Sequence, residues 1–138
     1  MKLINRGYKL WTRADTGGYV SKFEVYKEKM DWMMAKPGLC ENVVMRMCEN
    51  LKAKWHEVYF DNFFTSLSLL QHLYESGVYS CGTTCTNRKG MPDFFLGKSL
   101  ERSNSDFRVA GDYFIVVVKW MDNKSVHVAS NFHDTGLK

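Results

Sequence analysis

The sequence predicts an α/β fold in which a mixed sheet packs against helices. Strand-like runs rich in Val, Tyr, Phe and Trp recur along the chain, and two segments between them carry apolar residues at helical spacing. The order helix, strand, helix, strand over residues 41–86 is typical of a βαβ unit. A chain of 138 residues, 45% hydrophobic and 14% aromatic, is also long enough for one globular domain with a sizeable core.

An antiparallel hairpin is predicted near the N-terminus. Residues 8–13 and 19–26 form its strands, and Asp15-Thr16-Gly17-Gly18 supplies the turn between them. Alternation along the second strand places Tyr19, Phe23 and Val25 on one face and Lys22 and Glu24 on the other. This pattern indicates that one side of the hairpin meets solvent.

A first helix is predicted over residues 41–53, because its apolar residues recur at helical spacing: Val43, Val44, Met47, Cys48 and Leu51. Residues 56–60 then predict a strand. A second helix starts at the N-cap Ser66 and stops at Gly77. Its predicted apolar stripe consists of Leu67, Leu70, Leu73 and Tyr74.

Strands dominate the remainder of the chain. Residues 78–86 predict the second strand of the βαβ unit, and residues 90–106 are irregular and polar around a short apolar patch. Residues 112–120 and 125–130 predict a second hairpin around residues 121–124.

Asp61 follows the strand at 56–60 directly and precedes the second helix. Open α/β sheets place ligands at the carboxyl ends of their strands, so this carboxylate is a candidate metal ligand. Asp-Asn before a helix is also typical of a turn or cap, and the local sequence leaves both interpretations open.

The four cysteines do not show the close C-x-x-C spacing of structural zinc sites. Cys81 and Cys85 would lie roughly 13 Å apart in a regular strand. Cys40 and Cys48 would be separated by roughly 12 Å along a helix. We therefore expect free thiols, which suits a reducing compartment.

Four segments together resemble the core of piggyBac-type transposases: GYKLWTRADTGGYVSKFEVYKEK at 7–29, GLCENVVMRMCENLKAKWHEVYFDNFFTS at 38–66, GVYSCGTTCTNRKGMP at 77–92 and KWMDNKSVHVASNFHDT at 119–135. The resemblance implies a single partial catalytic domain over 1–138. It consists of an incomplete ribonuclease-H-like core at about 7–90 and a β-rich insertion at about 91–135. Such transposases cut and join DNA with three aspartates and Mg²⁺, and Asp61 matches the second aspartate.

The same resemblance places the other two aspartates outside the chain, before residue 1 and beyond Lys138. Asp15, Asp93, Asp106, Asp112, Asp122 and Asp134 fall elsewhere in the family pattern. Asp61 alone could donate a single Mg²⁺ ligand, whereas the reaction needs a two-ion clamp. We therefore expect a transposable-element-derived fragment without catalytic activity and with no cofactor of its own.

Residual DNA binding is the leading predicted function, because phosphate contact needs only positioned positive charge. The segment at 87–90 resembles a basic family motif, and its Arg88 and Lys89 are the candidate phosphate contacts. Cys85 stands where family members commonly carry Arg. A solvated loop is the alternative interpretation of this segment. Two other functions are an incomplete product of a longer, active transposase and a protein-interaction fragment.

Charge and hydropathy agree with a soluble intracellular protein that does not enter a membrane, and the resemblance implies a nuclear or other intracellular location. The net charge of +4 and pI near 8.9 are compatible with a polyanionic partner. The longest apolar run, residues 113–118, is too short to cross a bilayer, and the N-terminus lacks the apolar stretch of a signal peptide.

One consequence of the resemblance concerns stability. In a ribonuclease-H-like sheet the first strand lies between the second and the fourth, and the resemblance begins after that strand. Each buried ladder group left unpaired costs about 1–3 kcal/mol. We therefore expect a marginally stable chain, or one whose exposed sheet edges pair with a partner protein.

Overall fold

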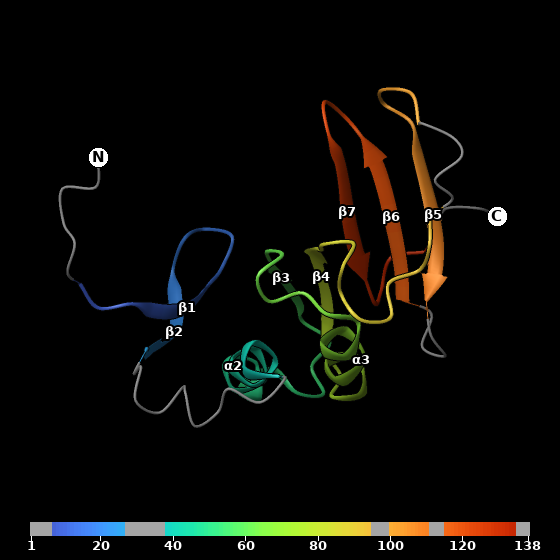
Figure 1. The fold of residues 1–138 in the computed structure, drawn as a ribbon. Helices are drawn as coiled ribbons and strands as arrows, with labels where there is room; N and C mark the ends of the chain where they lie inside the picture. The colour runs from blue at the N-terminus through green and yellow to red at the C-terminus, as the bar shows by residue number, and fades with distance from the viewer. Residues whose placement is uncertain (1–6, 27–37, 95–99, 111–114, 135–138) are drawn as a thin grey trace. The chain divides into compact units, whose positions relative to one another are not determined.

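A computed structural model describes residues 7–26, 38–94, 100–110 and 115–134 of the chain (Figure 1). The chain divides into two compact units, Met1–Asn50 and Leu51–Lys138. The described residues form a mixed α/β fold with a two-stranded sheet, a five-stranded sheet and two α-helices. The expected α/β class is confirmed at this level.

The first unit contains the predicted hairpin. Its strands β1 (Leu10–Ala14) and β2 (Val20–Val25) pair in antiparallel fashion. The turn forms because Asp15 accepts hydrogen bonds from the Gly18 N–H through its carbonyl (3.0 Å) and from the Tyr19 N–H through its side chain (2.9 Å). Gly18 has a φ of 86°, which glycine adopts without strain.

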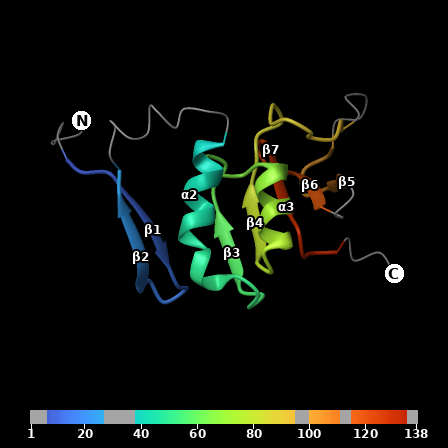
Figure 2. The ribbon, with the colours of Figure 1, turned by 90° about the horizontal axis from the view of Figure 1, so that it is seen from below.

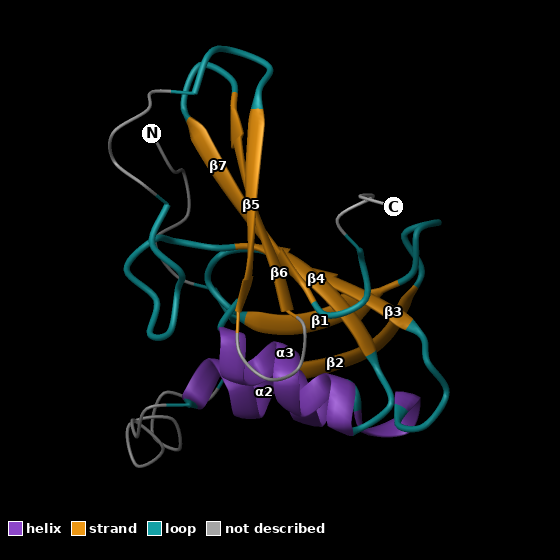
Figure 3. Cartoon of the chain, turned by 90° about the vertical axis from the view of Figure 1, so that its right-hand side faces the viewer, coloured by secondary structure: helices purple, strands orange, loops and turns teal. Residues whose placement is uncertain are grey.

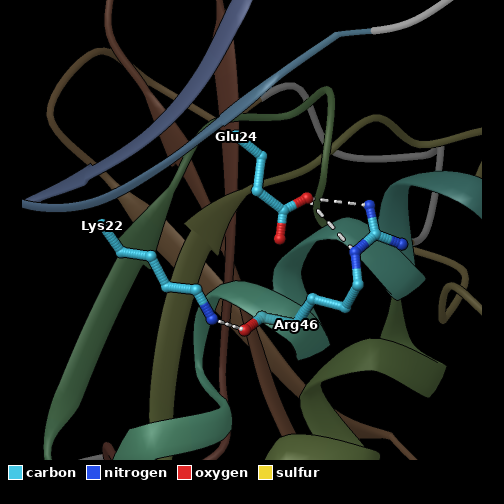
Figure 4. A network of polar contacts seen from close by, with 3 residues as sticks. All are labelled: Lys22, Glu24 and Arg46. Atoms are coloured by element: carbon cyan, nitrogen blue, oxygen red, sulfur yellow. Dashed lines mark hydrogen bonds and ion pairs between the residues drawn. The ribbon is translucent and has the colours of Figure 1, made fainter.

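The solvent-facing side of this hairpin is its apolar side. Tyr19 is 73% exposed and Phe23 62% exposed, whereas Lys22 and Glu24 are half-buried. Figure 4 shows the reason: Lys22 Nζ donates to the carbonyl of Arg46, and the Arg46 guanidinium contacts the Glu24 carboxylate at 3.1 Å. Polar contacts therefore attach the hairpin to the following helix.

That helix, α2 (Leu39–Met47), is shorter than expected and is followed by the 3₁₀ turn η1 (Glu49–Leu51). The prediction of a helix reaching Ala53 was wrong. The Ala53 N–H donates to the carbonyl of Ser76 rather than to a carbonyl one helical turn earlier, and its φ is +59°. The Arg13 guanidinium also occupies the end of α2, donating to the Met47 carbonyl at 2.5 Å.

The second unit begins with the predicted βαβ element, which is confirmed. Strand β3 (Glu57–Phe60) pairs in parallel with β4 (Tyr79–Thr83), and α3 (Leu67–Glu75) lies between them in sequence. Figure 2 shows α3 alongside β4. Ser66 caps α3 by accepting the Leu69 N–H at 3.1 Å, as expected. The strand expected over 78–86 is shorter, so Cys85 lies beyond it.

The buried face of α3 differs slightly from the predicted one, and the glycine that ends the helix has a second role in packing. The fully buried residues are Leu69, Leu70 and Leu73, while Tyr74 is 38% exposed and contacts Trp55 at the surface. Gly77 ends the helix with a φ of 73°, and a Cβ there would lie 2.7 Å from the Ala53 Cα. Glycine is therefore required by both conformation and space.

The five-stranded sheet has the order β3-β4-β7-β6-β5 (Figure 1). Its strands are drawn in orange in Figure 3. The second hairpin is confirmed as β6 (Ile115–Met121) and β7 (Ser125–Ser130), and residues 112–114 of the expected first strand lie outside the described residues. Strand β5 (Ser105–Ala110), which pairs with β6, falls largely beyond the expected irregular segment and was not predicted. Strands β3 and β5 are the edges of this sheet.

One face of the sheet carries the core of the second unit. Its buried members are Leu70, Ala110, Ile115, Val117 and Ala129, with Phe60, Leu67, Met91 and Phe94 packed against them. The buried side-chain amide of Asn131 connects the end of β7 to α3 and to the start of β4. Its Nδ2 donates to the carbonyls of Leu70 (2.8 Å) and Val78 (3.3 Å). No helix among the described residues has both the length and the apolar character needed to span a membrane.

Candidate functional site

The candidate site lies where β3 ends. Asp61 follows Phe60 directly, so its exposed side chain lies at the carboxyl end of a parallel strand. This is the position predicted from the sequence, and it is where α/β sheets present ligands.

The Asp61 carboxylate also stabilises the turn that leads into α3. Its Oδ1 accepts the Phe63 N–H at 3.1 Å, and its carbonyl accepts from Thr65 Oγ1 at 2.8 Å and from the Phe64 N–H at 3.2 Å. Asp61 therefore acts as a turn-stabilising residue, which is one of the two roles predicted from the sequence. Oδ2 accepts no hydrogen bond from the residues that the structure describes.

The loop after β4 reaches this turn through Arg88. Its Nη2 donates to the carbonyl of Asn62 at 2.6 Å and to that of Phe63 at 3.1 Å. The side-chain amide of Asn62 in turn lies 3.6 Å from the sulfur of Cys85. The structure therefore brings the predicted metal ligand Asp61 and the predicted DNA contact Arg88 into one region.

Lys89, the second predicted DNA contact, is exposed on the same loop. It makes no hydrogen bond or ion pair with the described residues. Gly90 follows with a φ of 81° and turns the chain toward Met91, which packs on the core. Arg88 and Met91 therefore hold the loop against the rest of the second unit, while the Lys89 side chain faces solvent.

Close packing beneath the turn fixes its position. A Cβ on Gly82 of β4 would lie 2.5 Å from the Phe60 carbonyl oxygen and would also collide with Thr65 Oγ1. Thr65 itself is fully buried. The sequence offered no signal for this role of Gly82 or Thr65, because it depends on contacts between β3, β4 and the turn.

Three of the other aspartates take part in contacts outside the Asp61 turn. Asp106 pairs with Arg108 at 2.7 Å, Asp122 pairs with Arg102 at 3.3 Å, and Asp15 closes the first hairpin. Asp112 lies outside the described residues. Within the described part of the chain, no three His, Cys, Asp or Glu side chains gather in a way that could hold a metal ion.

All four cysteines are free thiols. Burial raises the pKa of Cys48 and the pKa of Cys81, so both favour the neutral thiol. The nearby cations Arg13 and Lys22 oppose this effect at Cys48. Cys85 is half-buried beside Asn62.

Comparison with models of known protein families identifies one that matches this chain. The family model described as Transposase IS4 matches residues 1–138. The chain belongs to the IS4/piggyBac transposase family. This confirms the resemblance identified from the four sequence segments.

Individual relatives agree with this membership. Human PiggyBac transposable element-derived protein 3 is 33% identical over 138 residues, and human PiggyBac transposable element-derived protein 2 is 28% identical over 140 residues. Each alignment covers 94% of this chain and 23% of the relative. The chain is thus piggyBac transposase-derived and spans 23% of the length of these relatives.

A solved structure shares the fold. The cryo-EM structure of the piggyBac transposase synaptic complex with hairpin DNA superimposes with a TM-score of 0.79 and 20% sequence identity. The match covers 100% of this chain and 30% of that transposase chain. The mixed sheet with its two helices therefore corresponds to part of a piggyBac transposase.

Proposed function

We propose that this family member contacts DNA phosphates through the loop carrying Arg88 and Lys89 and does not catalyse strand transfer. The observation that carries the proposal is the position of this loop, which reaches the Asp61 turn at the carboxyl end of β3. Lys89 is exposed and Arg88 is half-buried, and cationic side chains beside a strand end supply what phosphate binding requires. DNA contact also favours a nuclear location.

The proposal includes a domain assignment. Residues of about 7–90 would form an incomplete ribonuclease-H-like core, and residues of about 91–135 a β-rich insertion. The βαβ element with Asp61 after its first strand supports the core assignment. The antiparallel strands β5, β6 and β7 support the β-rich insertion.

The donor set at Asp61 does not fit a two-ion centre. One oxygen of its carboxylate accepts the Phe63 N–H, which leaves Oδ2 to donate to a cation. Mg²⁺ prefers octahedral oxygen coordination, and phosphoryl transfer with two ions needs several carboxylates around them. We therefore assign Asp61 at most a single Mg²⁺ ligand and propose no cleavage step for this chain.

Binding of the purified chain to a short DNA duplex across a salt series tests the proposal. We expect micromolar affinity at low salt that falls steeply as salt rises. The double variant Arg88→Ala/Lys89→Ala should bind more weakly. A matched control, Arg102→Ala/Lys124→Ala, removes the same charge near the β6–β7 turn and should bind like the wild type.

Two results would contradict this function. The first is the absence of binding by a folded sample at low salt. The second is an equal loss in the control variant, which would indicate a general charge effect. Cleavage of supercoiled plasmid in the presence of Mg²⁺ by this chain would overturn the assignment as non-catalytic.

A second candidate function is protein interaction at the sheet edges. Strand β3 is an edge of its sheet, and Tyr59 on it is 61% exposed. Edge strands present unpaired backbone groups to which an extended segment of another chain can add. Association with a protein that persists at high salt, without DNA binding, would favour this candidate.

A further inference from the structure

We infer that Arg88 is a positioning residue that holds the Asp61 turn, and that Lys89 makes the direct phosphate contact. The second half of this inference rests on the proposed DNA binding, whereas the first half does not. The two basic residues are neighbours in sequence, yet the structure gives them different surroundings.

The Arg88 side chain is committed to the backbone of the turn. A single nitrogen, Nη2, donates to two successive carbonyls, Asn62 at 2.6 Å and Phe63 at 3.1 Å. Hydrogen bonds from a guanidinium to carbonyl oxygens are charge-assisted and stronger than neutral ones. They bridge segments 25 and 26 residues apart in sequence, so Arg88 ties two loops together.

Both ends of this connection are fixed. On the loop side, the Arg88 N–H donates to the Cys85 carbonyl, and the Arg88 carbonyl accepts the N–H of Met91, which packs on the core. On the turn side, Thr65 Oγ1 donates to the Asp61 carbonyl at 2.8 Å and Thr65 is fully buried. Arg88 thus connects two anchored points and restricts the orientation of Asp61.

The Lys89 side chain makes no comparable hydrogen bonds to the described residues of the turn. It is exposed, and it makes no hydrogen bond or ion pair with the described part of the chain. A lysine ammonium binds phosphate as a point charge and needs no fixed geometry. Lys89 can therefore meet a phosphate without breaking an existing contact, whereas Arg88 Nη2 already donates to two carbonyls.

Three variants of the full chain test this division when they are compared with the wild type: Arg88→Gln, Arg88→Lys and Lys89→Gln. Amide hydrogen exchange, followed by NMR on ¹⁵N-labelled protein, reports the turn through the N–H groups of Phe63, Phe64 and Thr65. The salt dependence of binding to a short duplex reports phosphate contacts.

We expect Arg88→Gln to speed exchange of the three turn amides by about tenfold or more, with little change in the salt slope. Arg88→Lys should also exchange fast, because it restores the charge but not the guanidinium. Lys89→Gln should exchange like the wild type and lower the magnitude of the salt slope by about 0.9. Amides of β6 and β7 should be unchanged in all variants if the fold is intact.

Wild-type exchange in Arg88→Gln would overturn the positioning role. Equal loss of salt slope in Arg88→Gln and Lys89→Gln would overturn the division between the two residues. If the wild type does not bind DNA at low salt, the proposed function fails, and the exchange data still decide whether Arg88 holds the turn.

Discussion

The side chain of Asn131 and the backbone of Ser80 form a reciprocal contact in the interior of the second unit. Asn131 Oδ1 accepts the Ser80 N–H at 2.7 Å, and the Asn131 N–H donates to the Ser80 carbonyl at 3.1 Å. Asn131 Nδ2 also donates to Ser80 Oγ at 2.8 Å. The amide therefore continues the pairing of β7 with β4 beyond the last strand residue.

Asn131→Ala should lower the free energy of unfolding by about 2–3 kcal/mol, because it leaves the buried Ser80 N–H without its partner and removes the Nδ2 hydrogen bond to the Leu70 carbonyl. Urea titration in the cold, with a stabilising osmolyte present, measures the change. Asn123→Ala, in the exposed β6–β7 turn, is the matched control and should be nearly neutral. Equal stability of the two variants would contradict the role of Asn131.

Gly82→Ala should displace the Asp61 turn. The new methyl group would press on the Phe60 carbonyl and on Thr65, at a cost of about 1–3 kcal/mol for overpacking. NMR shifts of the Phe63 and Thr65 amides and the urea midpoint both report this change. Gly7→Ala meets nothing within 4 Å and should leave both unaffected. Unchanged turn shifts in Gly82→Ala would show that the site tolerates the methyl group.

Arg13→Ala should loosen the first hairpin from α2. Arg13 Nη1 donates to the Met47 carbonyl at 2.5 Å and to Asn50 Oδ1 at 2.7 Å, so a cation is lost from the C-terminal end of the helix. We expect a loss of about 1 kcal/mol. Faster amide exchange in β1 and β2 would show it. Arg102→Ala, which removes a largely exposed pair with Asp122, is the control whose β1 and β2 amides should stay protected.

Acid should destabilise the chain through His127. Burial, together with Lys119 on the neighbouring strand, lowers the pKa of His127 below 6.5. The Phe94 ring lies 5.5 Å from the imidazole, and the Arg108 guanidinium lies over Phe94. The folded protein therefore favours the neutral ring, and this contribution to stability is present above about pH 6.5 and is lost as the pH falls toward the folded-state pKa.

Urea midpoints measured from about pH 8 to about pH 5 check this dependence. The fall in midpoint with acid should be smaller in His127→Gln than in the wild type. His56→Gln, at an exposed position, should keep the wild-type pH dependence. An identical pH dependence in His127→Gln and the wild type would rule out His127 as its source.

Local signals in the sequence were sufficient for features whose chemistry is contained in a few residues. The turn at Asp15 and Gly18, the Ser66 cap and the stop at Gly77 each depend on neighbours close in sequence, and all were predicted. The position of Asp61 after a parallel strand followed from the order of helices and strands. The family resemblance supplied the interpretation of that position.

Features set by distant contacts were not predicted. The expected helix does not reach Ala53, whose N–H donates to the carbonyl of Ser76 in the loop after α3. Strand β5 follows a polar segment and alternates Asp106 and Arg108 with apolar residues, and its pairing with β6 decides its structure. The carbonyls that receive Arg88 lie 25 and 26 residues away from it, beyond the reach of any local pattern.

The first hairpin has its apolar face toward solvent and its charged face toward α2, so its attachment to α2 and its self-association should depend on the salt that is added. Screening by added ions weakens the charged contacts of Lys22 and Glu24 with α2. Strongly hydrated anions such as sulfate also favour burial of the outward-facing Tyr19 and Phe23. Sulfate should therefore weaken the attachment of this hairpin to α2 and also promote association between the apolar faces of hairpins in different molecules. Chloride at equal ionic strength should mainly weaken the attachment to α2.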